Sequence, residues 1–576
     1  MTLRKLLGLV PSPVLFIFLL AFFLRTYKLA ELPVGFHADE VRVGWNAYSI
    51  LKTGRDDWGN RLPLYYNTFG DFRPTGYFYL TIPSIIAFGT TEFAVRFPGA
   101  LFGALTIVSL YFFVRQCVSK SILRSRYFTL DTASASALLL ALSPWHISLS
   151  RATSEGIVAV FLVITGLSLL IYYLHTRRAL FLLPALLLLL SSYLFYHSAR
   201  LLVPLLATTT AGYFWWQYYK NTRGANVFHL PGGKYALLLL LLLFLVTLAF
   251  SLNKEARARF SQVSIIHDLD VKFELDKMPF EEGPNRVFIA RFFHNKPSVW
   301  ARRFIDEYMQ YISAKFFLVP KEAKPLRYAT VGMGILTYAE FALLILGLVA
   351  LAQKKNYTSV LFLFLFLLSP LPAAITTEDA PNMHRALFMA PFVSVLSAFG
   401  LFYLMNTQRH STLLRNAAFV VVGLNFIFFS HMYLTHNRVN NPLYRNVGAK
   451  ELAMKIDTIK DVYDEILITN IPDSPYPWIA YFANQDPKVF NTDAQARDKG
   501  VWTSNNLVFT GMRCPSRDAF KQDSENELNK VKKLLVVDAE ACEAEAYKYN
   551  YGENVTILDQ IKRPDGTIVY TLWARE

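Results

Sequence analysis

Two adjacent carboxylates, Asp39 and Glu40, follow the first long apolar run of the chain. Ionised carboxylates at a membrane boundary require water, a cation or a reaction that uses them. Such a group can accept a proton from a hydroxyl or help to bind a metal ion. Neighbouring residues of a helix point about 100° apart, so the two carboxylates are predicted to do different jobs. The alternative is that both are ordinary acids of a helix N-terminus, where the helix dipole favours negative charge.

A second polar group runs from Ser148 to Glu155, between two later apolar runs. Arg151 and Glu155 are four residues apart, which places them on one face if this segment is helical. Glu155 is then either a second acid that acts with Asp39 or one half of an ion pair at a helix end. The residue types leave both interpretations open.

Five basic residues lie on the predicted outer side: His197 and Arg200 open one apolar run, His384 and Arg385 open another, and Arg73 lies in the first long loop. A guanidinium group suits bidentate binding of phosphate. The alternative is that these side chains extend to lipid head groups. Several of them at ends where basic residues are otherwise sparse favour an anionic, lipid-linked ligand.

Common nucleotide and hydrolase motifs are missing from the sequence. There is no GxxxxGK[ST] loop, no GxGxxG after a strand, no HExxH and no GxSxG. An energy-rich donor is therefore expected to arrive through the membrane. A polyprenyl-phosphate sugar fits, because its phosphate leaving group activates the anomeric carbon.

The elements that position these residues are mostly membrane helices. Of the 576 residues, 53% are hydrophobic and 18% are charged, which is typical of a polytopic membrane protein. About eleven apolar runs are long enough to span: 8–25, 92–116, 130–147, 156–175, 179–195, 200–217, 234–252, 331–352, 357–375, 386–406 and 416–434. No cleavage site follows the first run, so a retained helix is favoured over a signal peptide.

The loop charges predict the orientation. Basic residues gather in alternate loops: Lys120, Arg124 and Arg126; Arg177 and Arg178; Lys220, Arg223 and Lys234; Lys354 and Lys355; Arg409 and Arg415. These loops are predicted to be cytoplasmic, with the N-terminus inside and, after an odd number of spans, the C-terminus outside. The net charge of +15 is thereby explained, and nucleic-acid binding is not expected.

Two outer loops are long, at about 26–91 and 253–330. In the first, Glu40–Leu51 carries an apolar stripe at helical spacing, which suits a helix lying on the membrane or under the core. This stripe consists of Val41, Trp45, Tyr48 and Leu51. In the second, Trp300–Leu318 is also predicted to be helical, and the loop is expected to shape access for an acceptor.

The composition becomes that of a soluble domain from about residue 440. The predicted strands are Ile466–Thr469, Leu507–Thr510, Lys533–Asp538, Val555–Leu558 and Thr567–Tyr570, with helical segments at 448–460 and 521–532 and a hairpin turn at Pro564–Gly566. This predicts a small α/β domain over 436–576, after a catalytic membrane domain over 1–435. Cys514 and Cys542 can pair if this domain is extracytoplasmic. Cys117 lies at the inner end of a run, and no cysteine spacing indicates zinc.

Several short motifs, taken in their order along the chain, resemble those of bacterial members of glycosyltransferase family 39, in the GT-C superfamily. This family includes protein O-mannosyltransferases and the aminoarabinose transferases of lipid A. The matching segments are Phe36-His37-Ala38-Asp39-Glu40, Asn46-Ala47-Tyr48, Thr53-Gly54-Arg55-Asp56, Leu62-Pro63-Leu64, Tyr77-Phe78-Tyr79-Leu80, Glu92-Phe93-Ala94-Val95-Arg96-Phe97-Pro98-Gly99-Ala100, Ser150-Arg151 with Glu155, Tyr196 with Arg200-Leu201-Leu202-Val203-Pro204, and His384-Arg385 before Pro391. They cover about residues 1–435.

The resemblance implies a multispanning GT-C fold that transfers a sugar, with mannose or another hexose as the default, from a polyprenyl-phosphate donor. Asp39 would be the general base that deprotonates the acceptor, with Glu40 supporting it and inversion at the anomeric carbon. Glu155 stands where relatives often have Asp, which leaves its role open. Arg200 and Arg385 are the expected ligands of the donor phosphate, with Arg73 and His384 beside them.

His37, Arg151 and His197 are expected to support these groups. No cofactor is implied, and a divalent metal is left open. The expected partners are the donor, membrane lipid and an acceptor that is protein, lipid or cell-wall glycan on the outer face of the plasma membrane. Two rival functions are a transporter or flippase of lipid-linked glycans and a non-catalytic membrane scaffold. The apolar span centres oppose the first, and the clustered outer acids oppose the second.

Overall fold

The computed structural model describes residues 12–68, 71–118, 122–124, 129–221, 233–283, 287–353, 357–407, 412–440, 442–471, 473–494, 501–521, 527–542, 551 and 554–576. Two compact units make up the chain. The first consists of residues 1–27, 64–76 and 99–432, and the second of residues 28–63, 77–98 and 433–576. Parts of the first long loop thus belong to the same compact unit as the C-terminal region.

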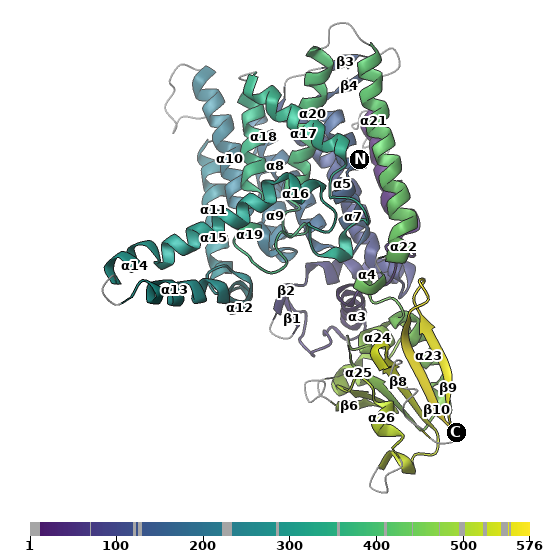
Figure 1. Cartoon of the computed structure of the whole chain (residues 1–576). Helices are drawn as coiled ribbons and strands as arrows, with labels where there is room; N and C mark the ends of the chain where they lie inside the picture. Colours follow the sequence, from purple (N-terminus) through teal and green to yellow (C-terminus); the bar gives the residue numbers. More distant parts are fainter. Residues whose placement is uncertain are drawn as a thin grey trace. The chain divides into compact units, whose positions relative to one another are not determined.

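The first unit is built from apolar helices that lie side by side (Figure 1). They are α2 (Ser12–Thr26), α6 (Thr132–Leu142), α8 (Glu155–Thr176), α9 (Leu182–Ser191), α10 (His197–Asn221), α11 (Gly233–Ser251), α17 (Tyr338–Gln353), α18 (Tyr357–Leu368), α20 (Met389–Thr407) and α21 (Thr412–His431), together with most of α5 (Glu92–Cys117). Every predicted apolar run overlaps one of these helices. Helices satisfy all backbone hydrogen bonds internally, which a chain in lipid requires.

Within the described residues, four stretches of helix are both long and apolar enough to cross a membrane: Glu92–Cys117, Glu155–Thr176, Gly233–Ser251 and Asn416–Asn440. The total of eleven crossings stays a prediction. So does the orientation, since many of its charges, namely Lys120, Arg126, Arg223, Lys354, Lys355 and Arg409, lie outside the described residues.

Helix α11 shows the character of the helical surface. Ala236, Leu239 and Leu243 are buried on its inner side. Its outer side carries exposed large apolar residues, namely Leu237, Leu238, Leu241, Phe244, Leu245 and Leu248. A helix of 19 residues that is apolar all round needs a hydrocarbon surrounding on its exposed side. The first unit is therefore a membrane-embedded bundle.

Helices α17 and α20 touch through their backbones. A Cβ added to Gly347 would lie 2.0 Å from the carbonyl oxygen of Leu396, and one added to Gly400 would lie 1.9 Å from that of Leu343. Small residues permit this approach, which provides van der Waals contact where lipid offers no hydrophobic driving force. The contact fixes α20, which follows the His384–Arg385 segment.

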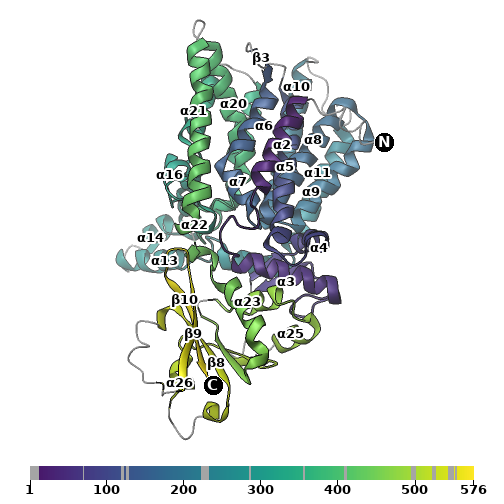
Figure 2. The same cartoon turned by 90° about the vertical axis from the view of Figure 1, so that its right-hand side faces the viewer.

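The second unit contains a six-stranded mixed sheet (Figure 2). Its strands are β5 (Glu465–Thr469), β6 (Val501–Ser504), β7 (Leu507–Thr510), β8 (Leu534–Ala539), β9 (Val555–Lys562) and β10 (Ile568–Arg575), in the order β6-β7-β5-β8-β10-β9. Strand β5 pairs in parallel with β7 and β8, and the other pairs are antiparallel. The five predicted strands and the α/β class of this region are confirmed, whereas β6 was not predicted.

The connections of this sheet follow the sequence signals closely. Gly566 has a φ of +87° in the hairpin turn between β9 and β10, as the Pro-Asp-Gly sequence predicts. Helix α23 (Ala449–Ile459) matches the predicted segment 448–460. Only part of the predicted helix 521–532 is described, and residues Glu527–Lys530 form a 3₁₀ turn there.

Helix α3 (Ala38–Thr53) carries the two adjacent acids and packs in the second unit against α24 (Tyr476–Phe482). Val41 and Trp45 of the predicted apolar stripe are fully buried, whereas Leu51 is exposed. The indole Nε1 of Trp45 donates a hydrogen bond of 2.9 Å to Oδ1 of Asn491. The stripe thus packs under the core of this unit, which was one of its two predicted placements.

Cys514 and Cys542 form a disulfide bond that closes a loop of 28 residues. A cross-link of this length stabilises a domain by about 2–4 kcal/mol, mainly by restricting the unfolded chain. We expect Cys542→Ser to lower the unfolding free energy of the C-terminal sheet by this amount. Hydrogen exchange of the β8 and β10 amides in the full-length protein measures it. Cys117→Ser is the control, and equal protection in both variants would contradict the expectation.

Candidate functional site

The N-terminus of α3 is closed by a capping box that includes its own acids. The N–H of Asp39 donates to Nδ1 of His37 over 3.1 Å, and the N–H of His37 donates to Oε2 of Glu40 over 3.1 Å. The N–H of Ala38 donates to Oδ1 of Asn446 over 3.1 Å. Three donors at the start of α3 are thereby satisfied, which fixes the direction in which the helix begins.

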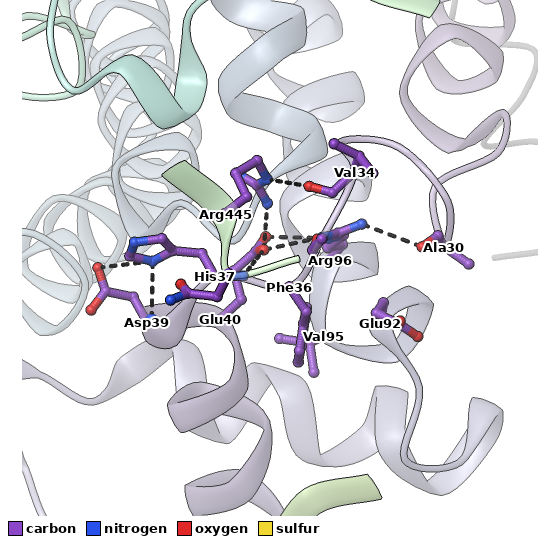
Figure 3. Close-up of polar contacts among 12 residues, drawn as sticks. Ala30, Val34, Phe36, His37, Asp39, Glu40, Glu92, Val95, Arg96 and Arg445 are labelled. Carbon is purple, nitrogen blue, oxygen red and sulfur yellow. Dashed lines mark hydrogen bonds and ion pairs between the residues drawn. The ribbon is translucent and has the colours of Figure 1, made fainter. Parts of the chain in front are cut away.

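Glu40 is buried between two arginines, Arg96 and Arg445 (Figure 3). Nε of Arg96 lies 3.2 Å from Oε1 of Glu40, and Nη2 of Arg96 lies 3.1 Å from Oε2. Nη2 of Arg445 approaches the same Oε2 to 2.5 Å. The bidentate contact with Arg96 and the further contact with Arg445 compensate the negative charge of Glu40, whose side chain is only 3% exposed.

The two arginines also bind the chain that leads into α3. Arg96 donates to the carbonyl oxygens of Leu29, Ala30 and Gly35, and Nε of Arg445 donates to that of Val34 over 3.0 Å. The guanidinium of Arg96 also lies 5.5 Å from the ring centre of Phe36. The Glu40 cluster, defined as Glu40, Arg96 and Arg445, therefore fixes the backbone on the N-terminal side of Asp39.

Asp39 has a different environment from Glu40. Its side chain is 24% exposed, and its Oδ2 lies 3.7 Å from Nδ1 of His37. Figure 3 shows this carboxylate on the opposite side of the helix start from the Glu40 cluster. A reactant can therefore reach Asp39, whereas Glu40 is enclosed by protein.

In the first unit, Glu155 opens helix α8 and lies near a group of polar residues. Nε2 of His384 lies 2.8 Å from the hydroxyl of Ser154 and would lie 3.0 Å from a Cβ at Gly156. The rings of His384 and Tyr196 have centres 4.9 Å apart. Tyr196 lies in the electric field of both Glu155 and Arg385. Three of the predicted site residues, Glu155, His384 and Arg385, are thus neighbours.

A second set of charges surrounds Glu378. Arg385 binds the carboxylate of Glu378 through Nη2 and its carbonyl oxygen through Nη1, the latter over 2.7 Å. Nη2 of Arg259 lies 2.9 Å from the same carboxylate, and Arg73 adds a further positive charge nearby. Burial alone would raise the pKa of Glu378, but the arginine charges outweigh it and hold this pKa below its ordinary value.

His197 and Arg200 stand at the start of α10. Nε2 of His197 donates to the carbonyl oxygen of Phe72 over 2.8 Å. Arg200 is buried, donates to the hydroxyl of Tyr65 over 3.0 Å and lies over the rings of Tyr65 and Phe250. These contacts join α10 to the hairpin of β1 (Tyr65–Thr68) and β2 (Asp71–Pro74), which carries Arg73.

Arg151 and Glu155 do not share a helix face. Helix α7 (Pro144–Arg151) ends at Arg151, Ala152 is extended, and α8 begins afresh at Glu155. Arg151 is buried, and its guanidinium donates to the carbonyl oxygens of Leu24 and Tyr27 over 2.8 and 2.7 Å. The shared face required this segment to be helical, and that condition is not met, because the chain is extended at Ala152 and Ser154.

The Glu378 contacts predict a pH effect. The folded-state pKa of Glu378 is lowered, so its ion pairs contribute stability above its ordinary pKa and lose it as pH falls through the folded-state value. Because the side chain is half-exposed, the effect is modest. We expect the difference in unfolding midpoint between wild type and Glu378→Gln to shrink as pH falls from about 6 to about 3. A difference that stays constant over this range would contradict the expectation.

Sequence reasoning missed Arg96, Arg445, Asn446, Arg259 and Glu378. Arg96 carried a signal, because a charged residue just inside an apolar run requires a partner. Arg445 and Asn446 carried none, since they are ordinary polar residues of a soluble region. Among the residues that the structure describes, no three His, Cys, Asp or Glu side chains gather as they would around a metal ion.

Comparison with known proteins bears on the fold. No protein-family model matches the chain, and no curated protein matches its sequence. The crystal structure of ArnT from Cupriavidus metallidurans in the apo state shares 12% identity with it, at a TM-score of 0.53, over 99% of this chain and 98% of that one. ArnT bound to undecaprenyl phosphate aligns at a TM-score of 0.48 and 11% identity, over 100% and 98%.

A third similar structure is the archaeal oligosaccharyltransferase AglB from Archaeoglobus fulgidus, in complex with an inhibitory peptide and a dolichol-phosphate. It aligns at a TM-score of 0.45 with 13% identity, over 95% of this chain and 71% of that one. The similarity to apo ArnT extends over nearly the whole of both chains. The GT-C type of fold that the sequence motifs imply is thereby confirmed.

Proposed function

We propose that this chain, which has the fold of ArnT, is a membrane glycosyltransferase that uses a polyprenyl-phosphate sugar as donor. The donor sugar is mannose or another hexose, and the acceptor is a protein, a lipid or a cell-wall glycan on the outer face of the plasma membrane. The C-terminal domain is extracytoplasmic in this proposal. Fold alone does not carry a function, so the proposal rests on the candidate site.

The observation that carries the proposal is the difference between two adjacent carboxylates. Glu40 is enclosed and neutralised by Arg96 and Arg445, whereas Asp39 remains accessible on a helix start that is held in place. An accessible carboxylate on a rigid support is what a general base requires. If Asp39 and Glu40 were only ordinary acids of a helix N-terminus, Glu40 would not need two buried arginines as partners.

In the proposed reaction, the carboxylate of Asp39 accepts the proton of an acceptor hydroxyl. The hydroxyl oxygen forms a bond to the anomeric carbon from the side opposite the phosphate, while the bond from that carbon to the phosphate oxygen breaks. Polyprenyl phosphate leaves with the electron pair, and the configuration inverts. Glu40 acts through the helix start and does not touch the reactants, so it is a positioning residue.

The cationic groups of the first unit are the proposed ligands of the donor phosphate. Arg73, Arg200, His384 and Arg385 provide them, and Glu155 lies near His384 and Arg385. Positive charge stabilises the phosphate oxygens as the leaving group gains charge. The partners of Arg385 and Arg200, Glu378 and Tyr65, orient these side chains before the donor binds. Three residues support the site through hydrogen bonds to nearby backbone groups, namely His37, His197 and Arg151.

The proposal is tested with purified wild-type protein in lipid nanodiscs and a panel of polyprenyl-phosphate hexoses and pentoses. Release of polyprenyl phosphate is followed with and without an envelope extract as acceptor. Release that depends on the extract supports transfer and names the donor sugar. In proteoliposomes, movement of the lipid-linked sugar across the bilayer without release would instead indicate a flippase. If neither release nor movement is observed, the protein is assigned to the scaffold function.

A further inference from the structure

Helices α12 to α15 form a segment that differs from the rest of the helical unit. They are α12 (Lys254–Val263), α13 (Leu269–Glu281), α14 (Val287–Phe293) and α15 (Lys296–Ile312). Figures 1 and 2 show α13 and α14 projecting beyond the helices of the bundle. Helix α15 confirms most of the predicted helix Trp300–Leu318, which is interrupted at Ser313 before α16 (Ala314–Leu318).

The projecting helices are apolar on the outside. Within α13 only Val271 is buried, and within α14 only Ala290, both helices being described in full. Phe280 and Phe288 are each 85% exposed, and the large apolar residues Leu269, Phe273, Ile289, Phe292 and Phe293 are also exposed. These side chains present an apolar surface on the order of several hundred Å², which soluble surfaces rarely leave uncovered.

The position of this surface indicates what covers it. Only Leu252 and Asn253 separate α12 from α11, the helix whose outer side faces hydrocarbon. Leu252 and Phe260 continue the exposed apolar residues of α11 into α12. Asn253 caps α12, and its Oδ1 accepts the N–H of Glu255 over 3.0 Å, so the chain turns sharply at the end of the span. The apolar surface of the segment is therefore continuous with the lipid-facing surface of the bundle.

The charges of the segment exclude an electrostatic partner. Residues 254–312 contain ten Lys and Arg residues and nine Asp and Glu residues, so their charges nearly cancel. Several of these pair with one another, including Arg302 with Glu274 and Lys277 with Glu281. A nearly neutral surface rich in phenylalanine suits the boundary between head groups and acyl chains, where aromatic side chains gather and binding follows buried apolar area.

We infer that α13 and α14 form a hairpin that inserts its exposed phenylalanines into the surface of the lipid bilayer at the end of α11. The bilayer of the same membrane is thus the partner of this surface. This inference does not depend on the proposed transferase activity.

The test measures the depth of single labels in the full-length protein. In a Cys117→Ser background, with Cys514 and Cys542 still joined, an environment-sensitive fluorophore is attached to Phe288→Cys. Separate proteins carry it at Phe244→Cys on the lipid-facing side of α11 and at Asp270→Cys, whose native side chain is 85% exposed. Each protein is placed in phosphatidylcholine nanodiscs, and quenching by acyl-chain nitroxides and by aqueous iodide is compared.

For an inserted hairpin, nitroxide quenching at 288 reaches at least about half of that at 244, and iodide quenching stays well below that at 270. A label at Phe292→Cys repeats the measurement in case the first variant misfolds. Iodide quenching at 288 equal to that at 270 would overturn the inference. Protection from both quenchers, with disulfide cross-linking between two copies through position 288, would also overturn it and assign the surface to self-association.

Discussion

Asp39→Asn should abolish sugar transfer while leaving the protein folded. A general base contributes on the order of 10²–10⁴-fold to the rate, and the amide of asparagine cannot accept the proton of the acceptor. The side chain is of equal size and keeps its place at the start of α3, so the capping contacts of His37 and Asn446 remain. The turnover number should therefore fall while donor binding stays near that of wild type. Release of polyprenyl phosphate measures the first quantity, and binding of unreactive polyprenyl phosphate measures the second.

The matched control is Asp270→Asn. Asp270 is also an aspartate in the first turn of a helix, so the control makes the same charge change at the same helix position. Its turnover should equal that of wild type. Full activity of Asp39→Asn, or an equal loss in both variants, would remove Asp39 from the proposed role.

Glu40→Gln should be the most destabilising conservative change in the second unit. It leaves the buried guanidiniums of Arg96 and Arg445 without their carboxylate. Loss of one member of a buried charge cluster costs about 3–5 kcal/mol. The effect should concentrate on α3 and on the chain from Leu29 to Gly35, which the two arginines bind. Hydrogen exchange of the α3 amides in the intact protein measures it, with opening increased on the order of 10²–10⁴-fold.

Glu451→Gln is the control for this change. Glu451 also accepts the N–H of its N-cap residue over 3.1 Å at the start of a helix, but among the described residues no arginine forms an ion pair with it. Its substitution should cost about 1 kcal/mol or less. Arg445→Gln should lie between the two, because Arg96 still binds Glu40 through two contacts. Equal effects of Glu40→Gln and Glu451→Gln would show that the capping box, and not the Glu40 cluster, holds α3.

Much of the fold could be predicted because its elements have local signals. Each apolar run of the bundle overlaps a helix, since hydrocarbon leaves few other conformations. Strands β5, β7, β8, β9 and β10 followed from alternating or continuous β-branched residues. Strand β6 was missed because Val501-Trp502-Thr503-Ser504 is short and lies at the edge of the sheet. The conformation after Arg151 stayed open in the sequence because Ala152-Thr153-Ser154 contains neither proline nor glycine.

The candidate site could be predicted only in part. Residue type and position singled out Asp39, Glu155, His384 and Arg385, and the structure places the last three near one another in the helical unit. The burial of Glu40 was beyond prediction, since its compensating charge comes from Arg445, and sequence gives no measure of which distant residues meet. The same holds for Glu378, whose three neighbouring arginines come from different segments.

The distance along the chain between Glu40 and Arg445 has a consequence for biosynthesis. Arg96 follows Glu40 by 56 residues, so the first pair can form early, but Arg445 follows by 405. At about 5–20 residues per second, the second arginine emerges roughly 20–80 s after the carboxylate. During that interval Glu40 of the nascent chain lacks its contact with Arg445. The Glu40 cluster is therefore complete only after the membrane helices that precede Arg445 in the sequence have been synthesised.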